Sequence, residues 1–300
     1  MSPKKIGVIS VLLASLMWAL EPVLAKLSYA QTDFVQTSAI RAIVVAIVAL
    51  FYVLISRGVS LRIKKKEAPV LLYIAFVGTL FADLLYFYAL ISIPVVNAVL
   101  IGHLQPLFII LLSFLVLKTD RLNRVDYLGI MLMMISAVFV TTKTLTNAYS
   151  LQFGSIGDAV VLLATIAWAT TAIAMRKYLT TLHAGVITFY RFFIAALVFG
   201  FFITINNMFV INIFQIAVGI VVGIGTICYY EGLKRLKAAQ VSGLELGAPV
   251  FAAIIGFLVL EEKVTWMQFS GIMLLILGIT LLSKKEKKTH EQNDNITRLP

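Results

Sequence analysis

The chain has 300 residues, of which 61% are hydrophobic and only 13% are charged, and its formal net charge is +11. Soluble domains are close to half apolar and about a quarter charged, so this composition excludes a soluble enzyme with one packed core. Ten membrane spans of about 21 residues would occupy roughly 210 residues, which leaves no room for a separate globular domain.

Long apolar runs follow one another from the N-terminus to residue 283. Runs of about 18 or more residues without charge are typical of membrane-spanning helices. We therefore expect an all-α, polytopic protein that crosses the lipid bilayer ten times. The expected spans are 6–28, 36–56, 69–91, 95–117, 125–142, 157–178, 185–205, 213–233, 238–260 and 265–283.

The basic residues form short clusters between the apolar runs, which is the pattern that orients a membrane protein, so no nucleic-acid partner is expected. With the N-terminus inside, the only basic residues in the outer connections are Lys143 and Lys263, and Lys26 lies near an outer helix end. This bias predicts a multi-pass protein of the cell membrane with both termini cytoplasmic. The basic tail 284–300 is expected to be disordered. A single cysteine, Cys228, excludes an internal disulfide and a multi-cysteine metal site.

The two halves of the chain repeat each other. Short segments of the first half recur in the second half in the same order, with one main change of length between them. The clearest pairs are Trp18-Ala19 with Trp168-Ala169, Arg41 with Arg191, Pro106 with Pro249, and Gly129 to Leu132 with Gly271 to Leu274.

Each half contains five expected spans, an odd number, so the second half should be inverted relative to the first. The connections agree, because 57–67 is rich in Arg and Lys whereas its counterpart 206–214 has no charge. Inverted repeats are typical of transporters, which hold a binding site near the bilayer midplane and expose it to either side by alternating access.

The repeated segments resemble a known family. Leu12 to Lys26 with Trp18, Leu162 to Lys177 with Trp168, the two repeated prolines, and Leu260-Glu261-Glu262-Lys263 followed by Gly271 are similar to two EamA repeats of the drug/metabolite transporter superfamily. The first repeat departs from the pattern, with Lys118-Thr119-Asp120 where the second has Glu261-Glu262-Lys263.

The resemblance implies ten helices, a central cavity lined by the first, third and fourth helices of each repeat, and transport of small metabolites. The fifth helix of each repeat is expected to be scaffold or dimer surface, so a homodimer is one option. The expected divisions are a cytoplasmic N-terminus 1–5, repeat one 6–143, an external linker 144–156, repeat two 157–283 and the cytoplasmic basic tail 284–300.

Ionisable groups inside a bilayer are costly, so they usually face the bundle interior and are functional candidates. Glu21 lies near the middle of the first span, and Pro22 after it frees the carbonyl of Trp18. Such a turn could bind an amine or a proton, or Glu21 could pair with a neighbouring helix. Asp83 shares a helix face with Tyr86, and it could bind substrate or pair with Arg41.

Other candidates follow from the repeats. Arg41 and Arg191 occupy equivalent positions, which favours packing or gating, although an arginine can also bind a substrate carboxylate.

His103 and Gln105 precede Pro106, where a histidine could titrate near neutral pH or serve as a hydrogen-bonded bundle residue. Glu245 lies within Gly243-x-x-x-Gly247, and close helix approach there could bury it against Arg191 or His103.

Trp18, Trp168 and Tyr229 could form aromatic walls or simply pack. The candidate substrate-binding residues are therefore Trp18, Glu21, Asp83, Tyr86, His103, Gln105, Trp168, Tyr229 and Glu245, and the gating or structural candidates are Pro22, Arg41, Pro106, Arg191 and Pro249.

Motifs for other chemistry are missing from the sequence, which contains no phosphate loop, no H-E-x-x-H and no G-x-S-x-G. We therefore expect no catalytic residues, no metal and no cofactor, and direct coupling to ATP is excluded. The leading hypothesis is a secondary transporter of small organic metabolites, such as an exporter of amino acids or related compounds. Proton coupling through Glu21, Asp83 or Glu245 and facilitated exchange both stay open. The alternatives are efflux of hydrophobic cationic drugs, an intramembrane enzyme, and a membrane scaffold or receptor.

Overall fold

The structure is a computed structural model that describes residues 3–56, 58–112, 124–150, 154–178, 182–208, 210–233, 235–236, 241, 244–245 and 247–296. Within these ranges every regular element is a helix, so the expected all-α class is confirmed. The helices are α1 (Pro3–Ser28), α2 (Phe34–Ile55), α3 (Ala68–Tyr73), η1 (Ile74–Asp83), α4 (Leu84–Ala89), α5 (Val95–Gly102), α6 (Gln105–Leu112), α7 (Arg124–Thr142), α8 (Leu145–Tyr149), α9 (Ile156–Tyr178), α10 (Ala184–Ile205), α11 (Ile213–Leu233), α13 (Gly247–Leu260) and α14 (Trp266–Ile296).

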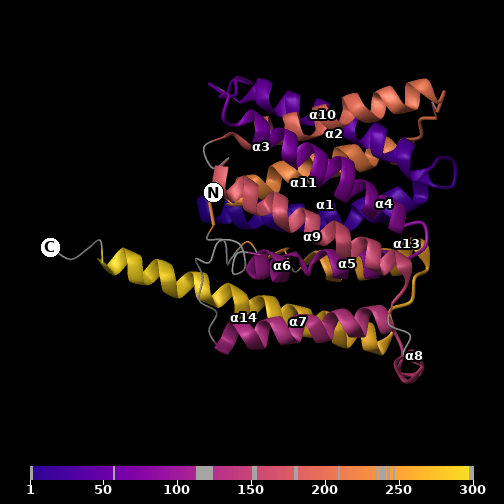
Figure 1. Cartoon of the computed structure of the whole chain (residues 1–300), viewed down its shortest axis with the longest axis vertical. Helices are drawn as coiled ribbons and strands as arrows, with labels where there is room; N and C mark the ends of the chain where they lie inside the picture. The colour runs from indigo at the N-terminus through magenta and orange to yellow at the C-terminus, as the bar shows by residue number, and fades with distance from the viewer. Residues whose placement is uncertain are drawn as a thin grey trace.

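The apolar helices correspond to the ten expected spans. Six of them are long and apolar enough to cross a membrane, and four shorter apolar helices fall in the fourth, fifth, ninth and tenth expected spans. Figure 1 shows the helices lying alongside one another, with the N-terminus and the C-terminal end of α14 toward the same end of the bundle. Large apolar side chains are exposed on the outside, among them Phe51, Leu54, Phe201 and Leu258. A lipid environment explains such a surface, because acyl chains do not penalise it.

Within the residues that the structure describes, the third and fourth spans are not continuous α-helices. The third consists of α3, the π-helix η1 and α4. The fourth is interrupted at His103 and Leu104, just before Pro106, which has no N–H to continue the helical ladder. π-helical turns and broken helices are frequent at functional sites, because they free backbone carbonyls for other partners. Both irregular segments contribute residues to the cavity described below.

The fifth helices of the two repeats, α7 and α14, pack antiparallel along one edge of the bundle (Figure 1). Ser136 in α7 donates a 2.7 Å hydrogen bond to the carbonyl of Gly271 near the start of α14. At the end of α7, the carbonyl of Lys143 accepts a 2.6 Å bond from the hydroxyl of Thr265. The chain directions are therefore opposite, as inverted repeats require.

The first helix of each repeat packs on the third helix of the other repeat. α1 runs against α11, where Gly232 and Gly225 let the helices approach near Val11 and Met17. In the same way α9 packs against η1 and α4. This crossed arrangement places the four helices around a shared centre.

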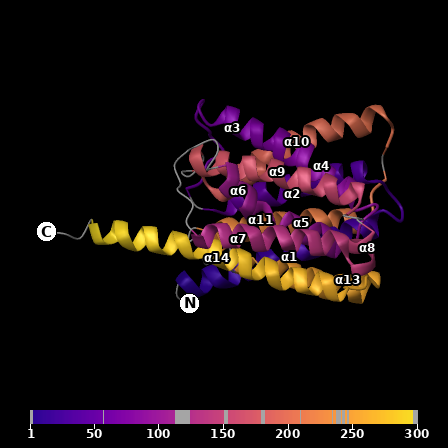
Figure 2. The ribbon, with the colours of Figure 1, turned by 60° about the horizontal axis from the view of Figure 1, so that its bottom comes forward.

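The C-terminal tail differs from the expectation of disorder. α14 continues as a helix to Ile296 and extends beyond the rest of the bundle (Figure 2). The sequence after Leu282 is rich in Lys and Glu, which are good helix formers, so the apolar helix can propagate into this segment.

Candidate substrate-binding cavity

A cavity of about 250 Å³ lies among the helices of both repeats. All of the candidate substrate-binding residues line it, as do Arg41, Pro106 and Arg191. Pro22 and Pro249 are buried and are not among the lining residues. The lining also includes Phe192 of α10 and Ile279 of α14, so the second and fifth helices contribute as well as the first, third and fourth.

Four ionisable side chains form a buried cluster on one side of the cavity. Arg41 Nη2 lies 3.1 Å from Glu21 Oε1 and 2.9 Å from Asp83 Oδ2. Arg191 Nη2 lies 3.1 Å from Asp83 Oδ1. Two carboxylates and two guanidinium groups compensate one another in charge, which offsets much of the cost of burying them. The pairing of Asp83 with Arg41 and of Glu21 with a neighbouring helix, both left open by the sequence, is present, and the partner of Glu21 is also Arg41.

Asp83 is the centre of this cluster. Besides both arginines, it accepts a 2.7 Å hydrogen bond from the indole N–H of Trp168. Arg191 is held further by Thr79, whose hydroxyl accepts from Nε at 2.7 Å. The carbonyl of Gly78 in the π-helix η1 accepts from both Arg191 and Trp168, at 3.3 and 3.2 Å. The irregular backbone of η1 therefore positions the cluster.

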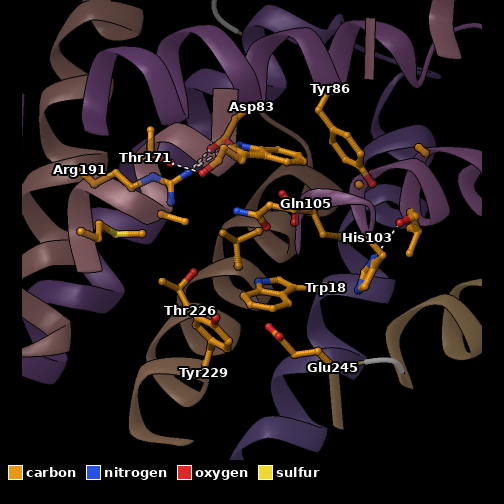
Figure 3. Close-up of a pocket in the computed structure, with 18 of the residues that line it drawn as sticks. Trp18, Asp83, Tyr86, His103, Gln105, Thr171, Arg191, Thr226, Tyr229 and Glu245 are labelled. Carbon is orange, nitrogen blue, oxygen red and sulfur yellow. Dashed lines mark hydrogen bonds and ion pairs between the residues drawn. The ribbon is translucent and has the colours of Figure 1, made fainter. Parts of the chain in front are cut away.

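Glu245 differs from the other acids. It forms no ion pair with any residue that the structure describes, so the predicted pairing with Arg191 or His103 is wrong. Arg191 pairs with Asp83, and His103 Nδ1 donates a 2.7 Å hydrogen bond to the carbonyl of Val99. Figure 3 shows the carboxyl of Glu245 beside Tyr229 and Trp18, on the side of the cavity opposite Asp83.

Two aromatic pairs line the cavity. The rings of Tyr86 and Trp168 are 5.3 Å apart at 53°, and those of Tyr229 and Trp18 are 5.0 Å apart at 52°. Tyr86 and Tyr229 have the same separation in sequence as Pro106 and Pro249, so the two pairs are copies of one another. The sequence contained this signal, because Tyr86-Phe87 matches Tyr229-Tyr230.

The symmetry of the repeats breaks at the acids. Glu21 corresponds to Thr171, and Asp83 corresponds to Thr226, both of which line the cavity. These threonines were not among the candidates, although the repeat alignment marks them. Because the second repeat has no acid at these two positions, Arg191 bonds to Asp83 of the first repeat.

A second polar network lies at the end of the bundle where α1 ends, at Ser28. The carboxylate of Glu262 accepts a 2.9 Å hydrogen bond from Lys26 Nζ. It also accepts from the backbone N–H of Val95 at 2.8 and 2.9 Å and from that of Val96 at 3.4 Å, at the start of α5. These bonds connect the loop before α14 to the fourth span and to α1.

At the opposite end, Tyr52 donates a 2.8 Å hydrogen bond to Glu231, which is also paired with Arg235. The ring of His183, which caps α10, stacks on Tyr52 with centroids 5.3 Å apart. Both ends of the bundle therefore contain contacts between the two repeats.

Known proteins are similar to this chain. An uncharacterized transporter of Synechocystis sp. is 30% identical over 237 residues, which are 73% of this chain and 66% of that protein, so the match spans about two thirds of the relative. The pseudopaline exporter CntI of Pseudomonas aeruginosa is 26% identical over 288 residues, 94% of this chain and 98% of the exporter. A crystal structure shares the fold with a TM-score of 0.68 over 95% of this chain and 99% of the other, at 19% identity.

A model of the EamA-like transporter family matches residues 5–142 and 155–284. These two matches cover both halves of the chain and confirm the two EamA repeats of a multi-pass membrane protein. The family is one of transporters and not of enzymes, which agrees with the missing catalytic motifs. The chain belongs to the EamA-like transporter family of the drug/metabolite transporter superfamily.

Proposed function

We propose that this protein is a secondary transporter that exports a small organic metabolite by alternating access. The observation that carries the proposal is the cavity between the two repeats, which is lined by charged and aromatic side chains. Inverted repeats can expose such a cavity to either side of the bilayer. The relative named as a pseudopaline exporter supports the outward direction, since the match covers 98% of that protein.

Transport can be tested with purified protein in sealed liposomes. Liposomes with the protein should accumulate or release a radiolabelled solute that chromatography recovers unmodified, and liposomes without protein should not. A screen of amino acids, nucleotides and cationic drugs by thermal shift selects the solutes. Imposing a pH gradient then separates proton coupling, which would change the flux, from facilitated exchange. Chemical conversion of every bound solute without movement would reject the proposal in favour of an intramembrane enzyme.

The proposed orientation has both termini in the cytoplasm. Ser60 and Asn206 are exposed residues in equivalent connections of the two repeats. After Cys228 is replaced by serine, Ser60→Cys should react with a membrane-impermeant maleimide only in inside-out vesicles, and Asn206→Cys only in right-side-out vesicles. Labelling of both positions from the same side would contradict the inverted topology and with it alternating access between two half-gates.

A further inference from the structure

We propose that Glu245, Trp18 and Tyr229 form a subsite for the positively charged ammonium group of the transported solute. This inference rests on the proposed transport function. It narrows the substrate to organic solutes that contain an ammonium group, whether or not they also contain other functional groups. Its first support is the charge of the cavity. Glu21, Asp83 and the two arginines compensate one another, so Glu245 is the one acid of the cavity without a cationic partner among the described residues, and a bound cation would supply one.

Unlike Glu245, the two arginines of the cavity are already paired with acids of the protein. Arg41 Nη2 is bonded to both acids, and Arg191 uses Nη2 for Asp83 and Nε for Thr79. Arg41 Nε is buried and makes no hydrogen bond. The presence of two arginines in the sequence suggested a substrate carboxylate, but the structure pairs Nη2 of each with carboxylates of the protein itself.

The two aromatic pairs differ in a way that marks one of them as a binding surface. On the first side, the indole N–H of Trp168 is bonded to Asp83. On the second side the position of Asp83 is taken by Thr226, and the indole N–H of Trp18 has no hydrogen-bond partner among the described residues. Trp18 and Tyr229 therefore both line the cavity, and Trp18 is not drawn into an ion-pair cluster as Trp168 is.

The acid of this subsite also lacks a copy in the other repeat. By the spacing of Pro106 and Pro249, Glu245 corresponds to Gly102, where an added Cβ would lie 3.7 Å from the ring of Trp168. A carboxylate beside two aromatic rings is the arrangement that recognises organic ammonium groups, through charge pairing and cation–π attraction together. Within the described residues no group of three or more His, Cys, Asp or Glu side chains could hold a metal ion, which favours an organic cation.

The test measures binding to detergent-purified protein by titration calorimetry with three solutes of one shape. The probes are 3,3-dimethylbutylammonium, the neutral 3,3-dimethylbutan-1-ol and the anionic 3,3-dimethylbutanoate. The unsubstituted protein should bind the ammonium at least about tenfold more tightly than the alcohol, and the butanoate most weakly. Glu245→Gln should abolish the preference for the ammonium, Glu245→Asp should retain part of it, and Trp18→Leu should weaken ammonium binding. The control Glu261→Gln removes a carboxylate from an exposed loop position and should leave all three affinities unchanged.

The outcomes separate the subsite from transport itself. Equal binding of ammonium and alcohol, or an ammonium preference that survives in a Glu245→Gln protein with unaltered melting temperature, would overturn the subsite. If Glu245→Gln does not fold, the Asp variant and the preference of the unsubstituted protein still decide the matter. Solute flux in liposomes that is insensitive to Glu245 would leave the transport function standing without the subsite. Binding that depends on Glu245, in liposomes that move no solute, would do the reverse.

Discussion

Asp83→Asn is expected to abolish solute flux and to destabilise the protein by roughly 3–5 kcal/mol, the usual cost of removing one partner from a buried ion pair. The carboxylate bonds to Arg41, Arg191 and the indole of Trp168, and Asp83 is only 3% exposed. Without it, the buried guanidinium of Arg41 keeps only Glu21 as an ion-pair partner, and Arg191 loses its ion pair with the first repeat. The melting temperature of the purified protein and the flux in liposomes measure the two effects.

The matched control is Glu261→Gln, which removes the same charge at an exposed position and should melt at the temperature of the unsubstituted protein. If Asp83→Asn melted normally and transported normally, the ion-pair cluster would have no part in either folding or function. Normal melting with abolished flux would assign the carboxylate to the transport cycle alone.

Glu262→Ala is expected to open the cavity at the end of the bundle where α1 has its C-terminus. The side chain accepts from Lys26 and from two backbone N–H groups at the start of α5, and helix N-termini are destabilised by about 0.5–2 kcal/mol when such an acceptor is removed. The bond to Lys26 connects α1 to the loop before α14. Its loss should therefore favour conformations in which the two repeats separate at this end.

Cysteine accessibility provides the measurement. Ala98 lies one turn into α5, is fully buried and lines the cavity. In a protein with Cys228 replaced by serine, Ala98→Cys should react with an impermeant reagent from outside several times faster when Glu262→Ala is also present. Glu261→Ala, the adjacent substitution, should leave the rate unchanged. An unaltered rate with Glu262→Ala would show that these bonds only cap α5 and do not hold the repeats together.

The fold was largely predictable from the sequence because the bilayer restricts the choices. Backbone groups in lipid must be satisfied internally, so long apolar runs become helices. The repeated pairs of Trp18 with Trp168 and Arg41 with Arg191 indicated two copies, which the family match confirms. The high cost of ionisable groups in a membrane likewise selected residues that the structure places around one cavity. Their part in substrate binding stays a prediction.

The partners of those residues could not be predicted. Glu21, Asp83 and Glu245 are similar in hydropathy context, yet only the first two are paired with arginines. The choice depends on contacts between repeats, and above all on the arrival of Arg191 from the second repeat at Asp83 of the first. The π-helix η1, which presents the carbonyl of Gly78 to this cluster, has no signal in local sequence preference.

One carboxylate, that of Asp83, serves guanidinium groups from both halves of the molecule. Any motion that separates the two halves must break the ion pair of Asp83 with Arg41 or with Arg191. Because Asp83 is buried, few water molecules are near to replace the lost hydrogen bonds. We therefore expect the unloaded carrier to reorient slowly and with a high activation enthalpy. If transport is coupled to an ion gradient, slow reorientation of the empty protein would limit the uncoupled flow of that ion when no solute is bound.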